Sequence, residues 1–435
     1  MKPVSRGIDR IEVTFDEPNL VANAGLLVVA TLVVRLGLER LINATVNLSG
    51  RVGGALPGRK VLTLVHAMVA GGSHIDHADM LRAGATGSVL SHRVMAPSTL
   101  GTFLRSFTFG HVRQLDKVLG EALRRAWALG AGPGEAQVVV DLDSTIAEVA
   151  GKAKQGAGYG YTHVLGYHPL VATLAATGEL LHVRMRKGAA NTGRGAKRFV
   201  EELVARIGRA GATGELIMRF DSGFWSNATI ATLERLDVGY TMGVRMVKAV
   251  VKVVSAIDES AWTPIEYTDD GEAEVAECEY KGRRLIVRRT RLVGPQATLW
   301  PQWRHFAFVT DLGGDAVDVD AFHRAHAAVE LAIRDLKEGA GLEHVPSGHF
   351  FANAAWLVCA ALAHNLIRWS ARLGELTPED QLVVARTLRT RFFSVPGRLV
   401  SRSGTPTLRG PLHWPWADAI ERALALVRAL PPVPI

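Results

Sequence analysis

The stretch "VVVDLDSTIAE", residues 138–148, sets the question that this chain poses. Three β-branched valines predict a buried strand, and it runs into two aspartates, Asp141 and Asp143. Side chains alternate along a strand, so both carboxylates point to the same face. Buried carboxylates are costly unless a cation meets them. The stretch therefore predicts a site that holds either divalent metals with a nucleic-acid phosphate or a small phosphorylated substrate.

The composition is that of a folded, basic protein. The chain has 435 residues, 48% of them hydrophobic, which suits two or three domains. Fifty Lys and Arg against 42 Asp and Glu give a net charge of +8, which weakly favours a polyanionic partner. Two cysteines are too few for a disulfide framework or a Cys-ligated zinc site. The apolar run 25–34 is too short to span a bilayer, and acidic residues precede it where a signal peptide is basic. We therefore expect a cytoplasmic protein with no membrane partner.

The spacing of apolar residues changes along the chain and predicts its organisation. Residues 1–135 have helical spacing and predict a helical N-terminal domain. The next block reads β-β-β-α-β-α-β, the order of an α/β domain. The predicted parts are the N-terminal domain 1–135, the core 136–245, a β-rich insert 246–304 that includes "KAVVKVV", the second part of the core 305–375, and C-terminal helices 376–435.

Three acids stand where an active site would need them. Asp143 ends the first strand, Asp221 ends the strand "LIMRFD", and Glu330 lies in a helix predicted over 320–338. Carboxylates at the ends of adjacent strands can bridge two Mg²⁺ or Mn²⁺ ions, which activate a water or a 3′-hydroxyl for attack on a phosphodiester. On an ideal helix, Glu330 shares a narrow stripe at the border of the buried face with three further side chains: His323, His326 and Lys337.

Several motifs resemble bacterial insertion-sequence transposases of the DDE type, in particular the insertion-sequence 1380 group, which is related to the group 4 transposases. They are "VVVDLDST", "AGYGYTHVLGYHPLVATLA", "RFDSGFWS", and Glu330 followed, after six residues, by Lys337. The resemblance implies an RNase H-like catalytic core with a β-rich insert, and the strand order above agrees with it. It also implies cut-and-paste transposition, with Asp143, Asp221 and Glu330 as catalytic ligands of Mg²⁺ or Mn²⁺. The implied partners are DNA, as terminal inverted repeats and target, and a second copy of the chain in a synaptic homodimer on the nucleoid.

Two other functions stay open at this point. His323 and His326 stand where the related signature has Tyr and Arg, and histidine is not reliably cationic at neutral pH, so one alternative is a decayed transposase that only binds DNA. Asp-x-Asp-x-Thr after an apolar run is also the first motif of haloacid-dehalogenase-type phosphatases, with Asp141 as nucleophile and Asp143 as general acid. A strand hairpin directly after the motif favours the RNase H-like order. Within that reading Asp143 is favoured as first acid, with Asp141 behind it.

The expected DNA contacts are basic side chains on strands and one aromatic ring. "HVRMRKG" and "KGRRLIVRRTR" (281–291) each aim arginines along one strand face; for the second, a solvated edge strand protected by charge is an equal alternative. Trp225 has the ring to stack on an extruded base, and a packed core aromatic is the alternative. The residues expected at DNA are Arg184, Arg186, Lys187, Arg284, Arg288 and Trp225.

Overall fold

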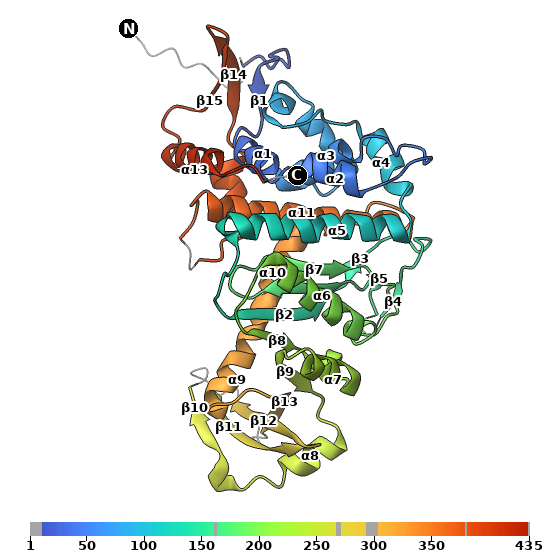
Figure 1. Ribbon diagram of the computed structural model, residues 1–435, viewed down its shortest axis with the longest axis vertical. Coiled ribbons are helices and arrows are strands. Elements are labelled where there is room, and N and C mark those ends of the chain that lie inside the picture. Colours follow the sequence, from blue (N-terminus) through green and yellow to red (C-terminus); the bar gives the residue numbers. More distant parts are fainter. Residues whose placement is uncertain (1–10, 161–162, 267–270, 293–302, 379–380, 434–435) are drawn as a thin grey trace.

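The computed structural model describes residues 11–160, 163–266, 271–292, 303–378 and 381–433 (Figure 1). The chain is elongated in this view, with a helical body towards one end and a large sheet that continues to the other. The N-terminal helices are α1 (Leu26–Arg35), α2 (Leu38–Thr45), α3 (Pro57–Val69), α4 (Pro97–Arg105) and α5 (Phe109–Ala126). Within this helical region, Ile75–Leu81 forms a 3₁₀ helix instead of an α-helix.

A nine-stranded mixed sheet forms the centre of the molecule. Its order is β10-β11-β12-β13-β9-β8-β2-β6-β7. The core strands are β2 (Val138–Ser144), β6 (Leu170–Leu174), β7 (Leu180–Arg184), β8 (Leu216–Phe220) and β9 (Gly239–Val244), with α6 (Ala196–Ala210) and α7 (Asn227–Arg235) between the last three. β2 is antiparallel to β6 and parallel to β8, which is parallel to β9. Three antiparallel strands followed by two parallel ones confirm the predicted RNase H-like α/β core. A small sheet beside it joins β3 (Ala147–Glu148), β5 (Leu165–Tyr167) and β4 (Gly158–Tyr159).

The insert extends this sheet. Its strands are β10 (Thr263–Ile265), β11 (Gly271–Tyr280) and β12 (Arg283–Leu292), and β13 (Arg304–Thr310) links them to β9 in antiparallel pairing. The run "KAVVKVV", predicted as a strand, is helix α8 (Lys248–Val254). That prediction was wrong because Val250 and Val254, one helical turn apart, are the residues that the fold buries. Residues 267–270 and 293–302 of the predicted insert lie outside the described residues.

A long helix, α11 (Phe350–Leu373), joins the sheet to the helical body. It contacts α3 and α5 on one side and β7 on the other. Its length and composition would allow it to cross a membrane, but 89% of its apolar window is buried inside the molecule. A helix that is apolar all round is expected in the core of a large domain. One continuous apolar core therefore runs from the N-terminal helices through α11 to the sheet.

The C-terminal region is only partly helical. It contains α12 (Ala385–Leu388) and α13 (Ala417–Ala429), but a hairpin of β14 (Gly397–Arg402) and β15 (Thr405–Arg409) lies between them. β1 (Leu20–Val21) pairs with β14, so the hairpin joins a segment near the other end of the chain. The prediction of helices throughout 376–435 was wrong here, because Ser403 and Gly404 adopt positive φ and turn the chain back on itself.

The segment that carries the third acid is a series of short helical pieces. α9 (Ala316–Arg324) leads through a 3₁₀ turn, Ala325–Ala327, into α10 (Ala328–Arg334), and a π-helical turn, Asp335–Gly339, follows. The prediction of one regular helix over 320–338 was right in position but not in geometry. The 3₁₀ turn changes the angle between residues on its two sides, so the ideal-helix stripe does not hold across it.

Candidate active site

Asp143 and Asp221 lie side by side at one edge of the sheet. β2 and β8 are parallel neighbours, and Leu142 pairs with Phe220 in their register. Asp143 and Asp221 each follow this pair by one position, so the two carboxylates lie side by side where β2 and β8 end. Asp221 also caps a short 3₁₀ turn, since its Oδ1 accepts from the amide of Gly223 at 3.0 Å.

Glu330 completes the group from α10, where it is exposed. The pKa of Asp143 is raised to about 6, mainly by burial and also by the negative charges of Asp221 and Glu330, while the Ser144 amide and His326 act to lower it. Burial raises the pKa of Asp221 too, opposed first by the Gly223 amide. The three acids are therefore close enough for their charges to act on one another.

The donor chemistry of these three acids suits a divalent metal, although their carboxylate oxygens do not all lie within 4.8 Å of one another. The donors are hard carboxylate oxygens, which suit Mg²⁺ or Mn²⁺. Like charges held together and partly dehydrated are unfavourable until a cation joins them, and raised carboxyl pKa values concentrate at such sites. Lys337 lies half-buried on the π turn of the same segment; burial lowers its pKa, and the charges of Asp143 and Glu148 raise it. π turns often mark functional positions.

Asp141 is engaged differently from Asp143. Its side chain is 1% exposed, and Arg219 donates to both of its oxygens, from Nε at 2.7 Å and from Nη2 at 2.8 Å. His326 Nδ1 lies 2.8 Å from the same carboxylate. Arg219 also donates to the carbonyl oxygens of Phe322 (2.7 Å) and Ala325 (3.3 Å). Asp141, Arg219 and His326 thus form a buried clamp that ties β2 and β8 to the segment bearing Glu330.

His323 has a packing role. Its Nδ1 lies 2.7 Å from Thr241 Oγ1, and its ring stacks on Phe308 with centroids 4.1 Å apart. Burial lowers its pKa to about 3, with a further contribution from His326, so the ring is neutral. Arg324 does not replace a lost charge at this site, because it pairs with Asp320 at 2.8 Å.

Most of the arginines predicted to contact DNA instead form ion pairs and hydrogen bonds within the protein. Arg184 pairs with Glu202, and Arg284 binds Glu277 and the carbonyls of Leu312 and Gly314. Arg288 pairs with Asp320 at 3.0 Å.

Arg186 is also buried, and it donates to the carbonyls of the loop beside Asp221: His168, Asn191, Thr192 and Arg194. Trp225 is half-buried with its ring 6.2 Å from Tyr280. Lys187 alone among the predicted residues is an exposed cation.

An open groove of about 380 Å³ lies next to Asp221. Its walls come from β4, the loop after β7 and the turn after β8. Tyr159 and Arg245 line it, and neither was predicted from the sequence. Arg219 was also missed, although an arginine inside the apolar strand "LIMRFD" must find a buried partner, and that requirement was a usable signal.

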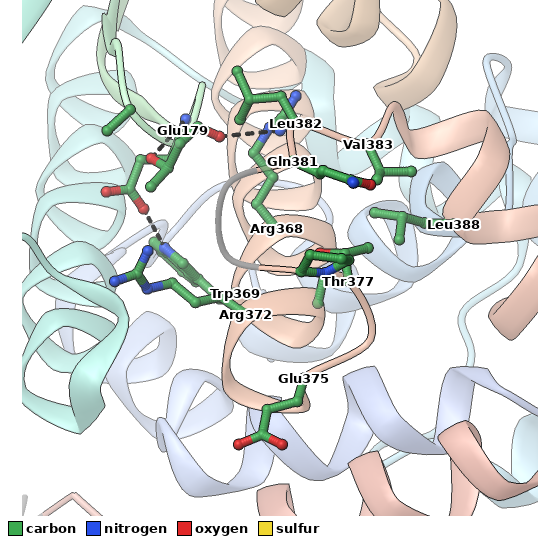
Figure 2. A pocket seen from close by; sticks show the side chains of 14 residues that line it. Glu179, Arg368, Trp369, Arg372, Glu375, Thr377, Gln381, Leu382, Val383 and Leu388 are labelled. Atoms are coloured by element: carbon green, nitrogen blue, oxygen red, sulfur yellow. Dashed lines mark hydrogen bonds between the residues drawn. The ribbon is translucent and has the colours of Figure 1, made fainter.

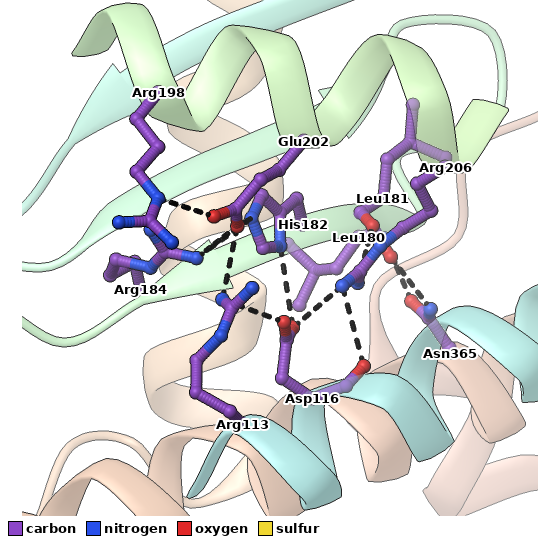
Figure 3. Close-up of polar contacts among 10 residues, drawn as sticks. All are labelled: Arg113, Asp116, Leu180, Leu181, His182, Arg184, Arg198, Glu202, Arg206 and Asn365. Atoms are coloured by element: carbon purple, nitrogen blue, oxygen red, sulfur yellow. Dashed lines mark hydrogen bonds and ion pairs between the residues drawn. The ribbon is translucent and has the colours of Figure 1, made fainter. Parts of the chain in front are cut away.

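A second cluster of ligand-type side chains lies between α5, β7 and α6 (Figure 3). Within the described ranges, Asp116, His182 and Glu202 are the group whose donor atoms lie close enough, within 4.8 Å, to hold a metal ion. Four arginines already compensate their charge: Arg113, Arg184, Arg198 and Arg206. Although burial raises the pKa of Asp116, Arg206 and His182 bring it well below its usual range. A cation would have to displace these guanidinium groups, so we interpret the cluster as a structural ion-pair network.

A small cavity of about 80 Å³ lies away from the acids, between the β6–β7 turn and the end of α11 (Figure 2). Glu179 is buried there, and its oxygens accept from the indole N–H groups of Trp127 (2.7 Å) and Trp369 (2.6 Å). Burial raises the pKa of Glu179 to about 7, against the two indoles, which lower it. This contact anchors the sheet to the helical body and has no reactive group opposite it.

Comparison with known proteins gives a family and a set of similar solved structures, in which seven chains match. A family model described as "Transposase DDE domain group 1" matches residues 5–432. The structure is similar to that of piggyBac transposase in a synaptic complex with hairpin DNA, with 14% sequence identity over 84% of this chain and 78% of that one, and a TM-score of 0.47. No curated protein matches the chain.

Proposed function

The chain belongs to the DDE transposase family whose model spans residues 5–432, and from this membership we propose that it cuts and joins DNA at the ends of an insertion sequence. The reaction would be cut-and-paste transposition: hydrolysis of a phosphodiester at each end, then attack of the freed 3′-hydroxyl on target DNA. We place the chain in the insertion-sequence 1380 group on the motifs quoted above.

The convergence of Asp143, Asp221 and Glu330 from two strands and a helix carries this proposal. Bound Mg²⁺ or Mn²⁺ would supply an activated nucleophile and stabilise the leaving oxygen. Deprotonated Asp143 would bind the metal together with Asp221 and Glu330. Among the described contacts, its carboxylate accepts a single hydrogen bond, from the Ser144 amide, and so has oxygen lone pairs free for a metal. Lys337 would balance negative charge beside Asp143. The clamp of Asp141, Arg219 and His326 would keep Glu330 close to the two strand acids.

The geometry argues against the phosphatase alternative. A nucleophilic Asp141 would need a free oxygen facing a substrate, but Arg219 and His326 engage both oxygens in the interior. The decayed-transposase alternative rests on His323 and His326. Arg219 weakens that argument, because it supplies a permanent positive charge next to Asp141 from another element.

We propose the helical region 1–135 as the part that binds the terminal repeats, with target DNA approaching the groove beside Asp221. Three exposed cations near the groove's loop, Lys187, Arg194 and Lys197, replace the four internally paired arginines as proposed contacts. The active form would be a synaptic homodimer in the cytoplasm, at the nucleoid.

The test is Glu330→Gln against Glu338→Gln, a matched change at an exposed acid of the same segment. The substrate is a supercoiled plasmid that carries the sequences flanking the gene. Loss of an outer-shell partner alone costs roughly 10- to 100-fold, so loss of a ligand should lower Mg²⁺-dependent nicking more than about 100-fold. DNA binding and the Glu338→Gln variant should stay at the wild-type level. Undiminished nicking by Glu330→Gln would falsify the assignment.

A further inference from the structure

The β14–β15 hairpin projects from the helical body as a two-stranded ribbon (Figure 1). β1 adds a third strand only at its base, where Leu20 pairs with Arg398 and Val21 with Gly397. The amide of Leu399 still donates to the carbonyl of Asn19, and from there to the turn at Ser403 and Gly404 the two strands pair with each other. The helical body separates it from the sheet that carries the acids.

The sequence around this hairpin contains basic residues and no acidic ones. Residues 385–410 contain six arginines and no Asp or Glu. In a chain with 42 acids, a run without any of them leaves the charge of the arginines uncompensated locally. Such a surface attracts polyanions.

The strand register divides the ribbon into two unlike faces. Leu399 pairs with Leu408, and both pack on a small apolar cluster that includes Val21 and Val395. The next pair towards the base, Arg398 with Arg409, must then point to the opposite face, because side chains alternate along each strand. Both arginines are exposed. One face therefore fixes the ribbon to the body and the other presents cations.

Arg398 and Arg409 stand directly opposite each other, and like charges in that position destabilise a strand pair. Glu17 pairs with Arg398 at 3.0 Å. Within the part of the chain that the structure describes, no acid pairs with Arg409. Glu17 offsets the charge of Arg398 only, and a phosphate between the two guanidinium groups would relieve the remaining repulsion through charge-assisted hydrogen bonds.

We propose that the Arg398–Arg409 face of the ribbon binds the phosphate backbone of duplex DNA, at a point separate from the catalytic carboxylates. The inference rests on the proposed function and adds a DNA contact to it. A two-stranded ribbon has the width of the DNA major groove, and guanidinium groups pair with phosphates in bidentate geometry. A second protein chain is a less suitable partner, because the ribbon's leucines, Leu399 and Leu408, lie on the opposite face and already pack on the body.

The experiment measures binding of a fluorescein-labelled random-sequence duplex by anisotropy, over roughly 0.05 to 0.2 M salt. Full-length wild type is compared with the double variant Arg398→Gln/Arg409→Gln. The control is Arg304→Gln, which makes one change of the same kind, with the loss of one positive charge, at an exposed position at the start of β13. Backbone contacts are independent of sequence, so the probe needs no element end.

We expect the double variant to bind about 60-fold more weakly at 0.1 M salt and to show a log–log salt slope shallower by about two, since each lost phosphate contact removes about 0.9 from the slope. Its melting temperature should be equal to or above that of wild type, because the repulsion is gone. The control should bind as wild type does.

Wild-type affinity and slope in the double variant would overturn this inference and leave the proposed function intact. An equal loss in the Arg304→Gln control, or a lower melting temperature that accounts for the weaker binding, would overturn it as well. A wild-type protein that binds no duplex would refute the proposed function itself, and the inference with it.

Discussion

Arg219→Met tests the buried clamp most directly. In the wild type, the guanidinium donates to both oxygens of Asp141 and to the carbonyls of Phe322 and Ala325. The two side chains are 4% and 1% exposed, so solvent does not screen the pair. The substitution keeps an unbranched apolar side chain but removes the guanidinium group, and it leaves the charge of Asp141 in the interior with His326 as its remaining described partner.

The expected cost follows from that burial. Breaking a buried ion pair by removing one partner costs about 3–5 kcal/mol, since the other charge remains unpaired in a medium of low polarity. Replacing both partners by apolar groups of similar volume is often close to neutral. The double variant Asp141→Leu/Arg219→Met should therefore recover most of the loss, and the two changes should be strongly non-additive.

Urea unfolding followed by tryptophan fluorescence measures these free energies, because urea is uncharged and leaves ion pairs unscreened. The double variant should fold yet nick DNA more slowly than wild type, because the hydrogen bonds from Arg219 to the carbonyls of Phe322 and Ala325 are lost. A loss below about 1 kcal/mol for Arg219→Met, the value of an exposed pair, would refute the reasoning. So would a double variant whose loss equals that of the single variants added together.

Two further predictions concern pH. The pKa of Asp143 is raised to about 6, and a carboxyl group must lose its proton to bind a metal. The Mg²⁺ concentration for half-maximal nicking should therefore rise about tenfold for each pH unit below about 6. A flat profile in that range would contradict the role of Asp143. The pKa of Glu179 is raised from 4.5 to about 7, so between these pH values the folded form keeps a proton that the unfolded form releases. The contribution of Glu179 to the free energy of unfolding is therefore full below about 4.5 and is lost as pH rises through about 7. The difference corresponds to about 3 kcal/mol, and urea unfolding at several pH values should show it in wild type and not in Glu179→Gln.

The strand acids could be predicted because their signal is local. "VVVDLDST" and "LIMRFD" each place an acid at the end of an apolar strand, and strands joined through a helix pair in parallel with their carboxyl ends together. The partners of those strands could not be predicted. Asp141 meets Arg219 from 78 residues away, and the arginines expected at DNA meet acids on other elements. A single sequence carries no record of such pairs.

Two regions show where local reasoning failed for different reasons. In α8, β-branched residues favour a strand by propensity, but tertiary packing decides, since Val250 and Val254 are buried by a helix. In the β14–β15 hairpin the signal was present: Ser403-Gly404 separates two runs of alternating residues and adopts positive φ at both positions. That turn could have been found from the sequence.

The clamp also bears on whether the histidines mark a decayed enzyme. Replacing an arginine by a histidine lowers the positive charge of a site only if no other basic side chain lies nearby. Here β8 supplies Arg219, whose guanidinium group reaches both Asp141 and the main chain of the third-acid segment. His326 then needs only to hydrogen-bond Asp141, which a neutral ring does through one N–H. The position of Glu330 thus depends on a strand arginine rather than on the helix, and the two histidines are compatible with an active site.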